Sequence, residues 1–90
     1  MARYVCGGFR AVEADGPTDA AQVFAGRLAR RRYGRSGIVG TLRRDSWTED
    51  GASVTFESFI GHPAERGGSM SRGDIVGSNE WLHVSLEGGA

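Results

Sequence analysis

The chain has no lysine, one cysteine, two prolines and no long apolar run, and each shortage excludes a class of protein. Cys6 alone cannot form an intramolecular disulfide, whereas a secreted scaffold of this size would usually carry several cysteines. No stretch approaches the roughly 18 apolar residues of a membrane-spanning helix. Residues 1–8 also lack the apolar run of a signal peptide. We therefore expect a cytoplasmic protein that does not enter a membrane.

Large aliphatic and aromatic side chains are also scarce, because Leu, Ile, Val and Phe make up 18 of the 90 residues. A chain this short buries only about 60% of the surface that its unfolded form exposes. A thin core of this kind excludes a large buried active site between domains. We expect a single domain over residues 1–90, with a frayed tail at residues 87–90.

The formal charge is zero because 11 arginines balance 11 acidic residues. The two kinds of charge are separated along the chain: residues 20–44 hold seven arginines and no acid, whereas residues 45–90 hold two arginines and eight acids. The seven clustered arginines are Arg27, Arg30, Arg31, Arg32, Arg35, Arg43 and Arg44. The neutral total argues against a uniformly basic nucleic-acid coat protein and against an acidic DNA mimic.

Residues 18–33 are predicted to form the only helix. Pro17 suits the first helical turn and Gly34 suits the residue after the last turn. Thr18 is expected to cap the helix. At about 100° per residue, one apolar face is predicted to carry Ala20, Ala21, Phe24 and Leu28.

Alternation of apolar and polar residues predicts four strands, at residues 9–14, 37–47, 53–61 and 81–87. The order β-α-β-β-β indicates a two-layer α+β domain, with one helix packed on a mostly antiparallel four-stranded sheet. Residues 61–78 contain five glycines and are predicted to be a flexible loop, with a short edge strand at Ile75–Val76. Because one helix covers one sheet face, we expect the other face to expose Arg43, Trp47, Phe59, Trp81 and His83.

The arginine cluster has two interpretations. In the first, the cluster is a surface that binds an anionic partner. In the second, it is a set of cations at a helix C-terminus, where the helix dipole favours them. Arg31 lies only about 20° from Phe24 on the helical wheel. We therefore expect either that the helix overhangs the sheet edge there or that Arg31 reaches out of the apolar face to water.

The exposed aromatic residues Trp47, Phe59 and Trp81 also have several interpretations. They would contact a protein partner, since Trp and Arg are enriched at binding hot spots. They would stack on single-stranded RNA bases, pack on each other or on the long loop, or form a homodimer interface.

No catalytic signature is present, and we expect no cofactor and no metal. His62 and His83, with Cys6 and Glu57, match no known ligand spacing. The enzymatic alternative is a small toxin-type ribonuclease using Arg43, Arg44, His83 and Tyr33. Such toxins are usually basic and open with two helices, whereas this chain is neutral and has one predicted helix.

Two segments resemble known small proteins. FRAVEADGPTDAA at residues 9–21 resembles the strand-turn-helix opening of small phage and mobile-element proteins. VTFESFIG at residues 54–61, followed by a Gly-rich loop and EWLHVSL at residues 80–86, resembles the closing strands of compact type I anti-CRISPR inhibitors. Several of those inhibitors are strongly acidic, unlike this chain, and they offer no site residues to carry over.

The resemblance implies a non-enzymatic, phage-encoded inhibitor that acts in the cytoplasm of a bacterial host. It would bind a Cas effector complex and block recognition or cleavage of target DNA. The alternatives are a nucleic-acid-binding module that uses the arginine cluster, and the ribonuclease. The predicted partner-binding residues are Arg27, Arg30, Arg31, Arg32, Arg35, Arg43, Arg44, Trp47, Phe59 and Trp81.

Overall fold

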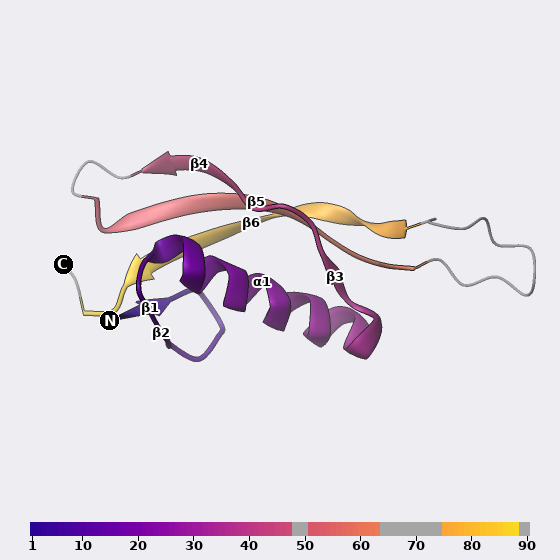
Figure 1. The fold of residues 1–90 in the computed structure, drawn as a ribbon, viewed down its shortest axis with the longest axis horizontal. Coiled ribbons are helices and arrows are strands. Elements are labelled where there is room, and N and C mark those ends of the chain that lie inside the picture. The colour runs from indigo at the N-terminus through magenta and orange to yellow at the C-terminus, as the bar shows by residue number, and fades with distance from the viewer. Residues whose placement is uncertain (48–50, 64–74, 89–90) are drawn as a thin grey trace, which may run out of the picture.

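The computed structural model describes residues 1–47, 51–63 and 75–88. One helix packs on one face of a curled antiparallel sheet (Figure 1), so the predicted α+β class is confirmed. The elements are β1 (Ala2–Val5), β2 (Val12–Ala14), α1 (Pro17–Tyr33), a 3-10 turn η1 (Gly34–Ser36), β3 (Ile38–Val39), β4 (Arg43–Trp47), β5 (Ser53–Pro63) and β6 (Ile75–Leu86). No helix in these ranges is both long and apolar enough to cross a bilayer.

The sheet has the strand order β2-β1-β6-β5-β3, and β4 also pairs with β5. Its layout differs from the four predicted strands. β1 was not predicted, and residues 37–47 form two short strands. The β5–β6 hairpin also extends into the predicted loop, since its pairing runs as far as Pro63↔Ile75. Both ends of the loop predicted at residues 61–78 are therefore strand, and residues 64–74 lie outside the described ranges.

The helix occupies nearly the predicted residues, but its N-terminus differs in one detail. Gly16 is the N-cap residue and no side chain caps the helix, so the expected cap by Thr18 is wrong. The C-terminus is as predicted: Gly34 has a φ of 63° and donates its N–H to the carbonyl of Arg30. Basic residues fill the last turn, where the helix dipole favours them.

The core lies between α1 and the inner faces of β5 and β6. Phe24 is fully buried, and four small side chains on the same helical face let the helix approach the sheet closely. The sheet contributes Val54, Phe56, Ile60, Leu82 and Val84. Leu28 is only partly buried at the margin of this core. The predicted apolar face of the helix is thus confirmed, with its centre nearer to Ala25 than to Leu28.

The outer sheet face carries rows of residues paired across three strands. Arg43 pairs with Glu57, which pairs with Trp81. His83 is exposed and pairs with Thr55 on the same face. No described element covers this face, as Figure 1 shows. The expectation of an uncovered sheet face therefore agrees with the described residues.

A bulge in β4 interrupts its pairing with β5. The register shifts between Arg44 and Ser46, and the backbone of Trp47 pairs with Val54. An extra residue of this kind changes the alternation of a strand. The side chain of Trp47 lies outside the described residues, so its predicted place on the open face stays a prediction.

Two glycines give a matched test of the sheet and helix packing. A Cβ on Gly77 would overlap the carbonyl oxygen of Ile60 and the Cα of Gly61, whereas a Cβ on Gly26 would meet open space. We expect Gly77→Ala to lower the free energy of unfolding by about 1–3 kcal/mol. Gly26→Ala should raise it by about 0.5–1 kcal/mol, because Ala favours the helix. Urea denaturation measures both, and equal effects of the two substitutions would contradict the described hairpin.

Candidate functional site

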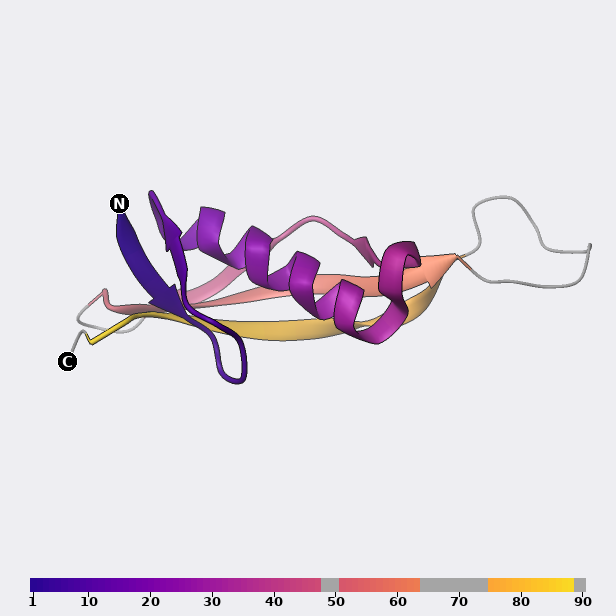
Figure 2. The same cartoon turned by 90° about the horizontal axis from the view of Figure 1, so that it is seen from below.

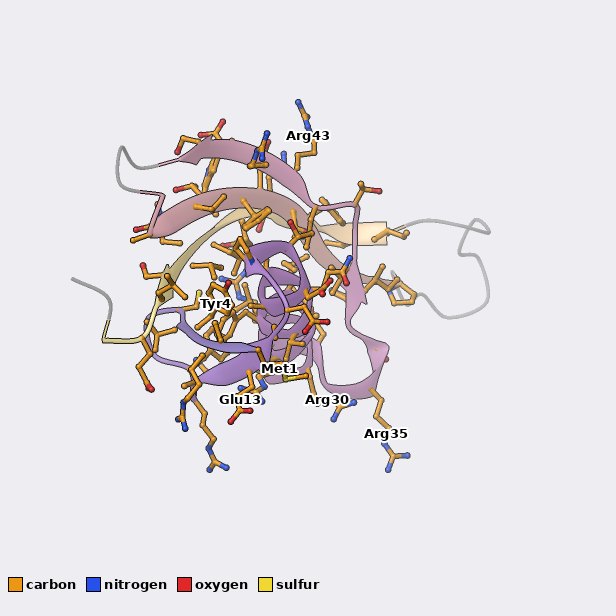
Figure 3. The ribbon with its side chains drawn as sticks, turned by 60° about the vertical axis from the view of Figure 1, so that its left-hand side comes forward. Met1, Tyr4, Glu13, Arg30, Arg35 and Arg43 are labelled. Atoms are coloured by element: carbon orange, nitrogen blue, oxygen red, sulfur yellow. The ribbon has the colours of Figure 1, made fainter. Side chains whose placement is uncertain are left out.

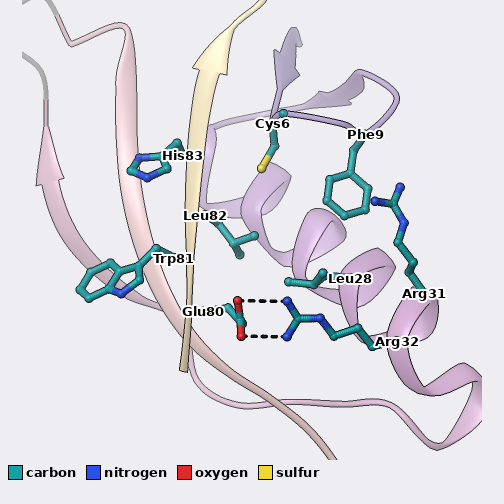
Figure 4. Close-up of a pocket in the computed structure, with 10 residues that line it drawn as sticks. Cys6, Phe9, Leu28, Arg31, Arg32, Glu80, Trp81, Leu82 and His83 are labelled. Atoms are coloured by element: carbon teal, nitrogen blue, oxygen red, sulfur yellow. Dashed lines mark hydrogen bonds and ion pairs between the residues drawn. The ribbon is translucent and has the colours of Figure 1, made fainter. Parts of the chain in front are cut away.

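A groove of about 370 Å³ runs along β6, beside α1 and the turn between β1 and β2 (Figure 4). We call it the β6 groove. Residues 80–83 of β6 form one side of it, Leu28, Arg31 and Arg32 of α1 form the other, and Cys6, Gly7 and Phe9 close one end. The groove thus combines residues from three segments that lie far apart in the sequence.

Strand alternation divides the β6 residues of the groove between two sides. Leu82 is 2% exposed and faces α1, together with Glu80. Trp81 is 50% exposed and lies on the outer side of β6 with His83 (Figure 4). A ligand at this groove would therefore meet an apolar and charged wall on one side of β6 and an aromatic ring on the other.

Arg32 forms the strongest polar contact of the groove. Its Nη1 lies 2.8 Å from Oε2 of Glu80 and its Nη2 lies 3.2 Å from Oε1, which is a bidentate arrangement. Ser78 also donates its hydroxyl to Oε2 at 2.6 Å. These hydrogen bonds lower the pKa of Glu80, and the bond to Glu80 raises the pKa of Arg32. The pair ties the C-terminal end of α1 to β6.

Two further arginines tie α1 to the β1–β2 turn. The guanidinium carbon of Arg31 lies 4.2 Å from the centre of the Phe9 ring, and Nη2 donates to the Gly8 carbonyl at 3.3 Å. Arg27 donates from Nη1 to the carbonyl of Arg10 at 2.9 Å. Arg31 therefore overhangs the sheet edge against Phe9, which is one of the two placements expected from the helical wheel. Both guanidinium groups stay at the surface.

Of the remaining clustered arginines, Arg30 lines a hollow together with Arg27, whereas Arg43 lies apart from the arginines of α1. Arg30 and Arg35 are exposed near the C-terminal end of α1, and Arg43 lies on the other side of the sheet (Figure 3). Arg44 pairs with Phe56 across the β4–β5 ladder and interacts within the molecule. The seven arginines that cluster in the sequence are thus divided over at least two sides of the fold.

The predicted aromatic residues are also separated. Trp81 borders the β6 groove, whereas Phe59 is half-buried and pairs with Asn79 further along the hairpin. Trp47 lies on β4, at the sheet edge beyond β5. Trp81 therefore shares the groove with the arginines, whereas Phe59 is not among its described lining residues.

The histidines and the cysteine form no common site in the described ranges, which contain no group of three or more His, Cys, Asp or Glu able to hold a metal. Nδ1 of His83 lies 2.9 Å from the Thr55 hydroxyl. The His62 ring instead lies 4.5 Å from that of Tyr33. The four residues of the ribonuclease interpretation are therefore not brought together, since Tyr33 lies with the other histidine. Burial raises the pKa of the Cys6 thiol.

Sequence reasoning missed two functional residues, Phe9 and Glu80. Glu80 is 48 positions from its partner Arg32, so no local pattern links them. Phe9 was assigned to a strand, whereas it lies in the turn after β1. The one available signal was the spacing of Arg27 and Arg31, which places both on the side of α1 that meets this turn.

Cys6 gives a test of the closed end of the groove. The thiol is 7% exposed and its pKa is raised by burial, so the reactive thiolate is scarce in the folded protein. We expect a disulfide reagent to modify Cys6 much more slowly in the native protein than in concentrated urea, measured by absorbance. Equal rates in both states would contradict the burial of this residue.

The Arg32–Glu80 pair gives a test that depends on pH. Because the pKa of Glu80 is lowered in the folded state, the pair stabilises the fold above the ordinary carboxyl pKa of about 4.3 and loses this effect as the pH falls through the lowered value. Glu80→Gln should lower the free energy of unfolding at pH 7 by up to about 1 kcal/mol, since the pair is partly exposed.

The same urea denaturation at low pH is the control for this prediction. The difference between the unaltered chain and Glu80→Gln should shrink as the pH falls through the lowered pKa of Glu80, because the carboxylate of the unaltered chain then becomes protonated. Arg32→Gln should behave similarly, and the double variant should lose little more than either single variant. Fully additive losses would show that the two side chains do not interact.

Neither a family model, nor a curated protein, nor a solved structure matches this chain. The resemblance to anti-CRISPR inhibitors therefore stays a prediction from the residues quoted for it. The function of the chain has to be argued from the chemistry of the β6 groove.

Proposed function

We propose that the chain is a non-enzymatic protein-binding domain that recognises an acidic partner through the β6 groove. The observation that carries this proposal is the placement of Trp81, half-exposed, on the same strand that borders Arg31 and Arg32. Trp and Arg side chains are the residue types most often found at binding hot spots. Bidentate guanidinium groups are well suited to carboxylates of a protein partner.

The charges of the groove support an acidic partner. Arg31 and Arg32 both line it, and Glu80 is the only acidic side chain among the described residues that line it. Arg27 adds a further positive charge beside Phe9, at the adjoining surface. One carboxylate therefore faces an excess of guanidinium groups, and a partner that supplies further carboxylates would neutralise them.

Nucleic-acid binding by the full arginine cluster is the second candidate, and the placement of the arginines weakens it. A phosphate backbone is held by a continuous series of cations. Arg43 lies on the side of the sheet away from Arg30 and Arg35 (Figure 3), so one strand of nucleic acid would not contact all three along a straight path.

The specific partner expected from the resemblance is a Cas effector complex, bound in a way that blocks target DNA. A pull-down against purified type I effector complexes tests this. Arg31→Glu should weaken capture by about tenfold or more, because a hot-spot change exceeds about 1.4 kcal/mol. Arg35→Glu is the matched control, since it makes the same charge change at an exposed residue outside the lining of the groove and should have little effect.

Three results would contradict parts of this proposal. Failure to capture any effector complex would remove the anti-CRISPR prediction. Equal losses with Arg31→Glu and Arg35→Glu would exclude the β6 groove as the contact surface. A gel shift with DNA or RNA that weakens steeply with added salt would favour the nucleic-acid alternative.

A further inference from the structure

The strand β6 has one incomplete edge. Its pairing with β5 is continuous from Ser53↔Ser85 to Pro63↔Ile75. On the other edge, β1 pairs only at Tyr4↔Leu86 and Val5↔Ser85. In the described part of the chain, residues 75–84 of β6 therefore have a neighbouring strand on one side only, as Figure 2 shows for the hairpin beyond β1.

The backbone groups that face the incomplete edge follow from two hydrogen bonds. Leu86 donates its N–H to Ala52 on the β5 side, whereas Glu87 donates to Arg3 on the β1 side. Successive residues of a strand direct their backbone groups to opposite edges. The odd-numbered residues of β6 therefore face the incomplete edge.

Two of these odd-numbered residues already have partners, and one of them is Ser85, which pairs with Val5 of β1. The backbone N–H of His83 forms a hydrogen bond with the thiol of Cys6. The next three are Trp81, Asn79 and Gly77, all exposed, and no described strand pairs with them on this edge. This stretch forms one side of the β6 groove at Trp81 and continues beyond it.

We propose that an extended acidic segment of a protein partner adds as a further strand to this edge of β6. The inference rests on the proposed function, because it specifies how the protein-binding domain holds its partner. Strand addition takes its affinity from main-chain hydrogen bonds and its specificity from pockets for alternate side chains. The edge supplies the first and the β6 groove supplies the second.

The groove sets the pattern of the added segment. Side chains directed toward α1 would meet Leu28 and Leu82 and the guanidinium groups of Arg31 and Arg32. Side chains on the opposite side would lie beside the half-exposed ring of Trp81. An acidic segment with alternating apolar residues fits both sides.

A second copy of the chain fits this edge less well. Two antiparallel β6 strands paired edge to edge would be related by a twofold axis perpendicular to the sheet. That axis puts both helices on the same sheet face, so the Arg31 and Arg32 groups of the two copies would face each other. Like charges across an interface oppose binding, whereas an acidic segment neutralises them.

The experiment uses a capped synthetic peptide that alternates Glu and Val, titrated into the labelled full chain at low salt. Amide hydrogen exchange, followed by NMR, should slow at Trp81, Asn79 and Gly77 and stay unchanged at the residues already bonded to β5. A peptide alternating Lys and Val is the charge control and should not bind. Two N-methylated versions of the Glu–Val peptide give a second control, each methylated on the alternate backbone nitrogens that face one edge of the extended peptide. Only the version that keeps its N–H groups on the edge facing β6 should bind.

A pair of variants tests the same edge from the side of the protein. Asn79→Pro removes one N–H from the incomplete edge without removing a bond to β5. We expect it to weaken peptide binding by about tenfold, because one hydrogen bond to the added strand is lost and the proline ring lies in the path of that strand. Asn79→Ala keeps the N–H and should bind like the unaltered chain. If Asn79→Pro fails to fold, the N-methylated peptides test whether backbone hydrogen bonds at this edge hold the added strand.

Three outcomes overturn the strand addition. In the first outcome, the Glu–Val peptide binds and Arg31→Glu abolishes this binding, but the amides of Trp81, Asn79 and Gly77 gain no protection. Strand addition is then wrong and the proposed function stands. If the peptide does not bind at all, strand addition by an acidic segment is wrong. The pull-down with effector complexes then still tests the proposed function independently. If the amides gain protection with protein concentration alone, the occupant is a second copy.

Discussion

The packing of α1 against the β5–β6 hairpin is the contact on which the rest of the structure depends. Phe24 and the alanines of α1 are buried against the inner face of these two strands. A helix of 17 residues is about 25 Å long at about 1.5 Å per residue, whereas a strand of 12 residues is about 40 Å long at about 3.3 Å per residue. One helix therefore covers only part of the hairpin.

This mismatch in length and coverage leaves parts of the sheet exposed. In the part of the chain that the structure describes, no element covers the outer sheet face, and β1 is too short to pair with more than the C-terminal end of β6. The arginines at the end of α1 lie where the sheet coverage ends. They hold the helix in place through Phe9 and Glu80, and they make the uncovered part of β6 positively charged.

The same arginines thus serve both interpretations that the sequence left open. Arg27, Arg31 and Arg32 contact carbonyls, a ring and a carboxylate within the molecule, as a purely structural role requires. Their guanidinium groups nevertheless remain at the surface beside a groove. Internal contacts of this kind fix the orientation of a charged side chain, which lowers the entropy that it loses on binding a partner.

Local sequence patterns predicted those parts of the fold that depend on local physics. The helix followed from Pro17, Gly34 and the apolar repeat, and the inner face of β5 followed from its alternation. The bulge in β4 depends on one extra residue in a pairing, which alternation alone does not reveal. The Arg32–Glu80 contact and the short β1 depend on pairing between distant segments, so they required the structure.

The most direct test of this account is amide hydrogen exchange of the isolated chain, without any partner. The central claim is that β6 is paired on one edge and open on the other. We predict slow exchange at Leu82, Glu80 and Ser78, whose N–H groups face β5, and fast exchange at Trp81, Asn79 and Gly77. Uniformly slow exchange along residues 77–82 would contradict the account, because it would mean that the edge is already occupied.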